Sequence, residues 1–548
     1  MLTTSQSFEG VSRALSDTAQ EAAAGAAPGS PRGQRWTTRT LPAAAFTLAA
    51  AAAGGCGGAE LDISFNPHEA TVQQLRTYVK TNFVSCRSLI SRYQLLHDSL
   101  DPSLRAVVTW NDRVLQDADR LDQTPPGQRG SFHCVPIVVK DNLNYAGLPT
   151  TGGASALGGA ITGNNAEAVQ RLVTAGAIVL GKTNMPDFAL DGINTLSSFG
   201  GQTVNPYNQK LTVYGSSGGS AAAVSASLGI IGLGTDTYGS LVLPAGATGL
   251  VTVRPTQGLV PATGILPLMS QQDAAGPMTR TVEDAAAALE LMVDKKFVAS
   301  GSQNYTAILK RDGLRGLTIG YDPAALQPLP MPPLTPSPEV VDLFSQTLSN
   351  LSRGGATTKQ VDVLLPLFPT LQTAVDLSFQ CMPVDFKQSL NGYLMTQRPE
   401  AKTKSLADII ATGQYLDSVK MFLNAAESQT DTIQSSSACQ QYLMAKAAAN
   451  SAIVALMDKQ GLDVLVYPVA NQPAFTAGNP PPVGFYSFQA LSSVSGLPSL
   501  AMPMGIAAKS GAPVGFILLA RNYQEATLIQ AAYSFQAQFQ PRTAPPTR

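Results

Sequence analysis

Residues 213–255 read VYGSSGGSAAAVSASLGIIGLGTDTYGSLVLPAGATGLVTVRP, and the rest of the chain is organised around them. It holds two glycine loops that carry serines, GSSGGS at 215–220 and GTDTYGS at 234–240. Residues 221–228, between them, are small, apolar and free of proline, which predicts a short helix. A flexible Gly/Ser linker is disfavoured, because the loops alternate with apolar runs such as 228–233. Glycine turns let a serine hydroxyl point outward beside converging N–H groups, which is the arrangement of a nucleophile and an oxyanion hole.

The composition narrows the classes of function. The chain of 548 residues has a net charge of -1 and no strongly basic run, so it lacks the charge pattern of a nucleic-acid-binding protein. Charged residues make up only 13%, well below the usual share, and small residues take their place. No apolar stretch reaches the roughly 18 residues of a membrane-spanning helix. No linker-like break interrupts residues 61–540, which predicts one large domain.

Residues 1–60 differ in composition from the rest of the chain. An Ala/Gly/Ser-rich start is followed by three arginines, the apolar run 41–53, and then Gly-Gly-Cys ending at Cys56. This order of basic, apolar and small residues is typical of an export signal. We therefore expect an exported protein, in the periplasm, at the outer membrane as a lipoprotein, or outside the cell. Cys56 is then a candidate for a lipid anchor, and an alanine-rich tail without a targeting role is the alternative.

The cysteines allow two disulfides. Besides Cys56 the chain has Cys86, Cys134, Cys381 and Cys439, and an even number in an exported protein permits two bridges. The pairs Cys86–Cys134 and Cys381–Cys439 are preferred because each pair lies in one region of the chain, and four buried thiols are the alternative. No CxxC or His/Cys spacing indicates a metal site, so no metal is expected.

A lysine follows the first buried strand. Residues 135–139 form an apolar, β-rich run that ends directly at Lys140. Buried lysines are rare and shift their pKa readily, so this position is a candidate for a catalytic base. The alternative is a lysine at a strand end whose ammonium group lies in water.

Two familiar motifs in the chain are misleading. Residues 176–183, GAIVLGKT, match the phosphate-loop pattern, but the intervening residues are strand formers and Pro186 stands where a helix should begin. Residues 215–219 match the GxSxG elbow, which needs a histidine downstream of its serine. All three histidines lie upstream, at His68, His97 and His133. We therefore reject nucleotide binding and a histidine-based triad, which leaves lysine as the available base.

The order of elements predicts an α/β fold, with a central mixed sheet covered by helices on both faces. Helical patterns are expected at 68–122, 166–175 and from about 281 to 291, and residues 339–460 are expected to be mostly helical. Residues 321–338 are proline-rich and predict a surface excursion. The strands are expected at 135–139, 177–181, 228–233, 250–254, 463–467, 500–506 and 514–519.

These motifs together resemble the amidase signature family of serine hydrolases. The residues that carry the resemblance are VPIVVKDN at 135–142, GKTNM at 181–185, the two serine loops, DAAGPMTRTVEDAA at 273–286 and SGLPS at 495–499. They occur in the family's order and spacing over roughly residues 70–535. The resemblance implies the amidase signature fold in a single domain over residues 61–540.

The resemblance also implies a catalytic triad. Ser240 would be the nucleophile, Ser216 a bridging serine on a cis peptide bond, and Lys140 the base. Lys140 must be neutral to accept a proton, and burial is what lowers the pKa of a lysine. The oxyanion hole would be formed by the backbone N–H groups of Thr237, Tyr238, Gly239 and Ser240.

Four positions depart from the family pattern. Tyr238 and Tyr214 stand where many members have glycine, and Cys134 replaces the glycine before the strand. Val242 replaces an arginine that is common two residues after the nucleophile, so Asp236 must find its partner elsewhere. These departures suggest a divergent subgroup.

The implied function is an amidohydrolase that cleaves a linear carboxylic amide, and also esters, in a small-molecule substrate. No cofactor and no nucleic-acid partner are expected, and both a monomer and a homodimer fit. One alternative is the amidase subunit of a tRNA-dependent amidotransferase, which works in the cytosol and is disfavoured by the export-like segment. Another is a non-catalytic binding protein on the same fold, disfavoured by the intact Lys140, Ser216 and Ser240. The substrate pocket is expected within 300–460 and 485–500, where motifs are sparse.

Overall fold

The computed structural model describes most of the chain beyond its first 64 residues. The described residues are 65–80, 84–159, 161–294, 296, 304–326, 336–398, 401–478 and 489–546. They belong to one compact unit, 64–548. The predicted export segment and Cys56 lie outside the described residues, and the division into 1–60 and 61–540 stays a prediction. Among the described helices, none is both long and apolar enough to cross a membrane.

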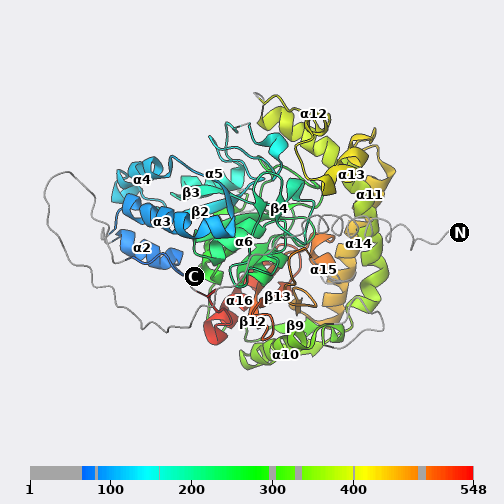
Figure 1. The fold of residues 1–548 in the computed structure, drawn as a ribbon. Coiled ribbons are helices and arrows are strands. Elements are labelled where there is room, and N and C mark those ends of the chain that lie inside the picture. The colour runs from blue at the N-terminus through cyan, green and yellow to red at the C-terminus, as the bar shows by residue number, and fades with distance from the viewer. Residues whose placement is uncertain are drawn as a thin grey trace, which may run out of the picture. The chain divides into compact units, whose positions relative to one another are not determined.

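An 11-stranded mixed sheet forms the centre of the unit (Figure 1), in the order β1-β3-β2-β6-β8-β7-β12-β13-β11-β9-β10. Strand β2 runs parallel to β3 and β6, β9 runs parallel to β10 and β11, and the other neighbours are antiparallel. A separate pair is formed by β4 (Leu196–Ser197) and β5 (Gly201–Gln202). The strands of the large sheet are β1 (Val107–Trp110), β2 (Pro136–Lys140), β3 (Ile178–Thr183), β6 (Ile231–Asp236), β7 (Val251–Arg254), β8 (Ala274–Thr279), β9 (Thr318–Tyr321), β10 (Thr357–Gln360), β11 (Val464–Pro468), β12 (Ser499–Ile506) and β13 (Pro513–Leu519).

Helices cover both faces of this sheet. Helices α6 and α7 contact each other and pack on one face, whereas α8 and α16 contact each other and pack on the other. The predicted α/β fold with a mixed sheet is confirmed. The helices are α2 (Val72–Lys80), α3 (Cys86–Leu104), α4 (Val114–Asp122), α5 (Glu167–Thr174), α6 (Gly218–Ser225), α7 (Val242–Ala247), α8 (Val282–Met292), α10 (Pro338–Arg353), α11 (Leu364–Gln397), α12 (Leu406–Thr412), α13 (Asp417–Glu427), α14 (Ser437–Gln460), α15 (Gln489–Ser493) and α16 (Glu525–Phe539).

The expected strands correspond to β2, β3, β6, β7, β11, β12 and β13, whereas β1, β8, β9 and β10 were not predicted. Strand β1 lies inside a segment predicted to be helical, because VVTW is too short to break the helical pattern on either side. Strand β8, AAGPMT, contains a glycine and a proline, which oppose a strand assignment from sequence. Strand β9 ends at the first residue of the predicted proline-rich excursion, and β10 lies in the region predicted to be mostly helical. The two strands pair with each other at the sheet edge.

Helix α6 lies very close to the sheet because both surfaces are small. All of its residues are buried, so it is covered on every side rather than amphipathic. It packs over Gly232 of β6, where an added Cβ would come within 3.0 Å of the Val224 side chain. This close approach brings the loop before α6 to the carboxyl end of β2 and β6.

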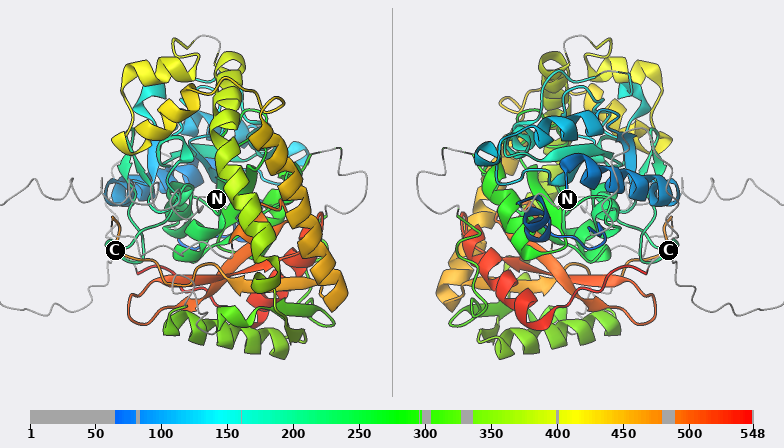
Figure 2. Two further views of the ribbon diagram at one scale, coloured as in Figure 1. Left: turned by 90° about the vertical axis from the view of Figure 1, so that its right-hand side faces the viewer. Right: turned by 90° about the vertical axis from the view of Figure 1, so that its left-hand side faces the viewer.

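Helices α11 and α14 lie side by side at one side of the unit (Figure 2). The disulfide Cys381–Cys439 joins them, and Cys86–Cys134 joins the start of α3 to the residues before β2. Both preferred pairings are therefore present. Since Cys381 and Cys439 belong to the same buried cluster as Tyr442 and Met269, the helical region 339–460 packs against the segment before β8 that contains Met269.

Candidate active site

Lys140 ends strand β2 in a fully buried position, with no exposed side-chain surface. A lysine with its ammonium group in water is thereby excluded. Burial lowers the pKa of Lys140 to about 7, although the carboxylates of Asp273 and Asp236 act in the opposite direction. A lysine with this pKa is neutral in half of the molecules near pH 7, so it can accept a proton.

The surroundings of the Lys140 amine suit its neutral form. Its Nζ lies 2.7 Å from Ser216 Oγ, 2.8 Å from Thr235 Oγ1 and 3.4 Å from the Thr235 carbonyl oxygen. A neutral amine has two N–H groups and one lone pair. The two N–H groups can donate to Thr235 while the lone pair faces the Ser216 hydroxyl. Asn142 Nδ2 also donates to Thr235 Oγ1, at 3.0 Å, and so helps to hold this acceptor in place.

Ser216 lies at the amino-terminal end of α6, after a cis peptide bond between Gly215 and Ser216. Its side chain is buried, and Lys140 is its neighbour. Tyr214, the residue before Gly215, has a positive φ of 56°. The cis bond that the family resemblance implied is therefore present, and the Ser216 hydroxyl lies at the end of β2, beside Lys140.

Ser240 lies in the loop between β6 and α7 and keeps 6% of its surface exposed. Its carbonyl oxygen accepts a hydrogen bond from the N–H of Ser217, at 3.3 Å, which ties the two serine loops together. The Ser217 hydroxyl donates to the Thr235 carbonyl at 3.0 Å, whereas the Lys140 amine lies beside the Ser216 hydroxyl. The structure thus brings Lys140 and Ser216 into direct contact and places Ser240 on the adjoining loop.

Asp236 shapes the loop that carries Ser240. Its carboxylate accepts the N–H of Gly239 at 3.0 Å and the N–H of Leu241 at 2.8 Å. This differs from the expected oxyanion hole, because the Gly239 N–H already has a carboxylate partner. A hole at this loop would therefore rest on the N–H groups of Thr237, Tyr238 and Ser240.

Arg254 is the partner that Asp236 was expected to find elsewhere. Its Nε lies 3.0 Å from Asp236 Oδ1, and both side chains are buried. Arg254 also donates to the Gln272 carbonyl at 2.9 Å. Arg254, at the end of β7, thus provides the ion pair with Asp236 that an arginine at position 242 would otherwise provide.

Replacing Arg254 with methionine should lower the free energy of unfolding by about 3–5 kcal/mol, because the Asp236 carboxylate would stay buried without its ion partner. Urea unfolding measures this change. Arg120→Met is the matched control: Arg120 is 75% exposed and pairs with Asp117, so its loss should be less than about 1 kcal/mol. Equal losses in the two variants would contradict a special role for the buried pair.

A chain of polar side chains that was not predicted from the sequence holds Thr237, in the loop that carries Ser240. Gln272 Nε2 donates to the Thr237 carbonyl at 2.6 Å, and Tyr442 of α14 donates to Gln272 Oε1. Asp273 accepts the Thr237 hydroxyl at 2.6 Å. Burial raises the pKa of Asp273 to about 6, against the effect of its bond to Thr237. No spacing rule links these residues, since Tyr442 and Gln272 are 170 residues apart.

Two other groups that sequence reasoning weighed have structural partners. Lys182, the lysine of the rejected phosphate loop, lies inside β3 and pairs with Asp141 at 3.0 Å, both fully buried. Cys86, Cys134 and His133 come within 4.8 Å of one another, a His/Cys cluster that the sequence spacing did not reveal. Because the two sulfurs are joined in a disulfide, they are not thiolate ligands, and His133 alone remains.

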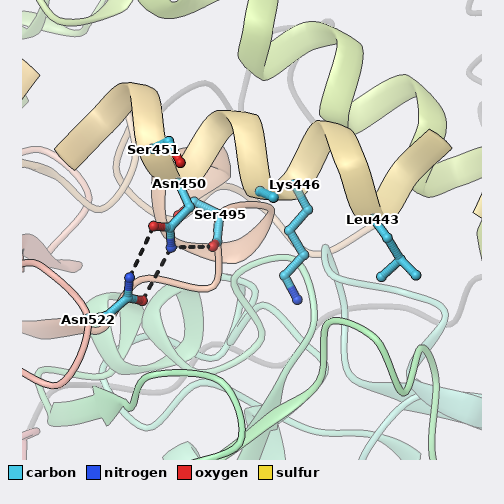
Figure 3. Close-up of a pocket in the computed structure, with 7 residues that line it drawn as sticks. Leu443, Lys446, Asn450, Ser451, Ser495 and Asn522 are labelled. Carbon is cyan, nitrogen blue, oxygen red and sulfur yellow. Dashed lines mark hydrogen bonds between the residues drawn. The ribbon is translucent and has the colours of Figure 1, made fainter. Parts of the chain in front are cut away.

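A cavity of about 400 Å³ lies against helix α14 (Figure 3). Lys446 and Asn450 point into it, and Asn450 pairs with Asn522 and the Ser495 carbonyl. Burial and the charge of Arg254 lower the pKa of Lys446 to about 7, and its amine donates to the Gln271 carbonyl at 2.6 Å. The lining residues are Leu443, Lys446, Ala447, Asn450, Ser451, Ser495 and Asn522, and they do not include Lys140, Ser216 or Ser240.

Known proteins match this chain over most of its length. The sequence model of the amidase family covers residues 87–529. The crystal structure of native peptide amidase from Stenotrophomonas maltophilia is 33% identical with a TM-score of 0.76, covering 87% of this chain and 98% of that one. An amidase family protein from Bacillus anthracis is 28% identical with a TM-score of 0.75, covering 88% and 93%. Among curated proteins, the A subunit of glutamyl-tRNA(Gln) amidotransferase from Lawsonia intracellularis is 30% identical over 455 residues, which are 78% of this chain and 89% of that protein.

The curated relatives overturn the predicted export. They are named as subunits of a tRNA-dependent amidotransferase, the enzyme that we placed in the cytosol, so a location in the periplasm, at the outer membrane or outside the cell is wrong. An alanine-rich segment after a few arginines produces the order of an export signal by composition alone. The prediction that the protein has no nucleic-acid partner is likewise unsupported, because these relatives are named as subunits of an enzyme that acts with tRNA.

Proposed function

The chain belongs to the amidase family, and we propose that it cleaves a carboxylic amide through an acyl-enzyme on Ser240. The observation that carries this proposal is the contact of 2.7 Å between Lys140 Nζ and Ser216 Oγ in a fully buried site. A buried lysine beside a serine is what a general base needs to work at neutral pH.

The proposed reaction begins with proton transfer along the triad. Neutral Lys140 accepts the proton of the Ser216 hydroxyl, and Ser216 takes the proton of Ser240. Ser240 Oγ then attacks the amide carbonyl carbon and forms a tetrahedral intermediate. Its oxyanion accepts hydrogen bonds from the N–H groups of Thr237, Tyr238 and Ser240, each worth roughly 3 kcal/mol.

The intermediate collapses when the C–N bond breaks. The proton held on Lys140 returns through Ser216 to the leaving nitrogen, which departs as an amine or ammonia. Water then attacks the acyl-enzyme with the same groups as base, which releases the carboxylic acid and restores Ser240. An ester would follow the same course, with an alcohol as the leaving group.

A second candidate function is that of the amidase subunit of a tRNA-dependent amidotransferase. The observation that favours it is the name shared by the curated relatives, which are 30%, 31% and 32% identical to this chain over most of its length. These names support the alternative better than a free-standing linear-amide hydrolase, whereas the likeness to peptide amidase supports the latter. The two candidates share the chemistry at Ser240 and differ in whether a protein partner is needed.

Turnover by the purified chain alone separates the two candidates. We expect the chain to release ammonia from peptide C-terminal amides and simple carboxylic amides without any partner, with free glutamine as the comparison substrate. Turnover of glutamine that appears only after the other subunits of an amidotransferase are added would instead establish the second candidate. Absence of turnover under both conditions would reject both.

A further inference from the structure

The Tyr238 side chain leaves the nucleophile loop and reaches helix α11. Tyr238 lies two residues before Ser240, and its hydroxyl donates to Ser378 Oγ at 2.8 Å. The same oxygen lies 3.7 Å from the sulfur of Met269. These two contacts fix the far end of the ring, although many family members have only a glycine at this position.

Phe379 of α11 stacks on the Tyr238 ring. The ring centroids are 5.0 Å apart and the planes differ by 7°, which is a parallel stack. Phe379 is 46% exposed, so the outer part of this pair faces solvent. A single exposed phenylalanine is ordinary on a protein surface. This one stacks on a residue that lies two positions before Ser240 in the chain.

The pair is uncharged. Two carboxylates lie nearby, and both are taken up by backbone N–H groups: Asp273 accepts those of Leu268 and Met269, and Asp385 accepts those of Ser270 and Gln271. The surface next to the loop is therefore aromatic and thioether in character. Because Ser378 and Met269 already hold the Tyr238 ring, a ligand that packs on the pair loses little entropy in ordering it.

We propose that the Tyr238–Phe379 pair binds an aromatic group of the substrate, so that the protein prefers amides with a planar ring next to the scissile bond. This inference rests on the proposed function, because it places the ring beside an amide carbonyl at Ser240. The main chain of residue 238 holds the carbonyl oxygen and its side chain lies against the substituent. One residue thus couples the position of the reacting group to the choice of substrate.

Two matched substrate pairs test the preference and locate the ring. Phenylacetamide against cyclohexylacetamide varies the acyl side, and N-benzylacetamide against N-(cyclohexylmethyl)acetamide varies the amine side. The methylene group keeps the carbonyl and the leaving amine electronically similar within each pair, and the sizes are closely similar. In at least one pair, kcat/KM for the aromatic member should exceed that for the cyclohexyl member by about fivefold. The substrate pair that shows the preference identifies which side of the substrate packs on Tyr238 and Phe379.

Phe379→Leu removes the ring and keeps an apolar side chain. In this variant the ratio of kcat/KM between the aromatic and the cyclohexyl member should fall to about 1, mainly because KM for the aromatic member rises. Phe368→Leu is the matched control, since Phe368 is also on α11 and is 41% exposed, and it should keep the preference.

The proposal that the Tyr238–Phe379 pair binds an aromatic group is rejected by either of two results. One is that the wild-type protein shows no preference in either substrate pair, and the other is that Phe379→Leu lowers kcat equally for all four amides. Failure of the proposed function has a different signature. In that case Ser240→Ala would retain turnover of all four amides, whatever the preference among them.

Discussion

Replacing Ser240 with alanine should lower kcat/KM for amides by about five orders of magnitude, to near the limit of detection. Removing the nucleophile of a serine hydrolase leaves only binding and oxyanion stabilisation, and losses of this size are typical. The protein should stay folded, because the bond that ties Ser240 to Ser217 uses main-chain atoms that alanine keeps. The initial rate of ammonia release at substrate concentrations below KM measures kcat/KM, and the circular dichroism spectrum reports whether the protein is folded.

Ser217→Ala is the discriminating comparison, because Ser217 occupies the centre of the GxSxG pattern. Its hydroxyl donates to the Thr235 carbonyl at 3.0 Å and accepts the Thr235 N–H at 3.2 Å, which is a structural role. This variant should lose stability and keep turnover that is easily measured. The reverse outcome, with an inactive Ser217→Ala and an active Ser240→Ala, would make Ser217 the nucleophile.

Replacing Lys140 with methionine should reduce amide turnover by about 10⁴-fold and ester turnover by much less. An amine leaving group needs the proton that Lys140 holds, whereas an alkoxide departs more readily without it. In the wild-type protein, kcat/KM should rise about tenfold per pH unit below pH 7 and level off above it, because only the neutral amine accepts a proton and its pKa is about 7. The rising limb should disappear in Lys140→Met.

Lys446 provides the control for the pH profile, since burial also lowers its pKa to about 7. It lines the separate cavity against α14 rather than the triad. Lys446→Met should keep the rising limb near pH 7. Loss of that limb in Lys446→Met, or equal effects of Lys140→Met on amides and esters, would mean that Lys140 is structural.

The sequence was most informative where the chemistry depends on local segments. The loops 215–220 and 234–240 flank a short helix and a strand, so they must meet at one end of that strand, and the structure brings them together through Ser217 and Ser240. Lys140 was also predictable, because it ends an apolar strand that can only be central. These features follow from neighbours in the chain.

The remaining features of the site depend on contacts between distant segments. The sequence indicated that Asp236 needed a new partner, but only the pairing of β7 with β8 brings Arg254 to it. The support of Thr237 by Gln272 and Tyr442 depends on how α14 packs, which no local pattern encodes. The Gly239 N–H was assigned to the oxyanion hole because the sequence does not show that Asp236 turns back to accept it.

Mapping a covalent label shows directly whether Ser240 is the nucleophile. The protein is treated with a fluorophosphonate at pH 8, digested with trypsin, and the modified residue is located by fragmentation of the peptide that contains both serine loops. We expect one adduct, on Ser240, which is lost in Ser240→Ala and strongly slowed in Lys140→Met. An adduct on Ser216 or Ser217, or unchanged labelling of Ser240→Ala, would contradict the account.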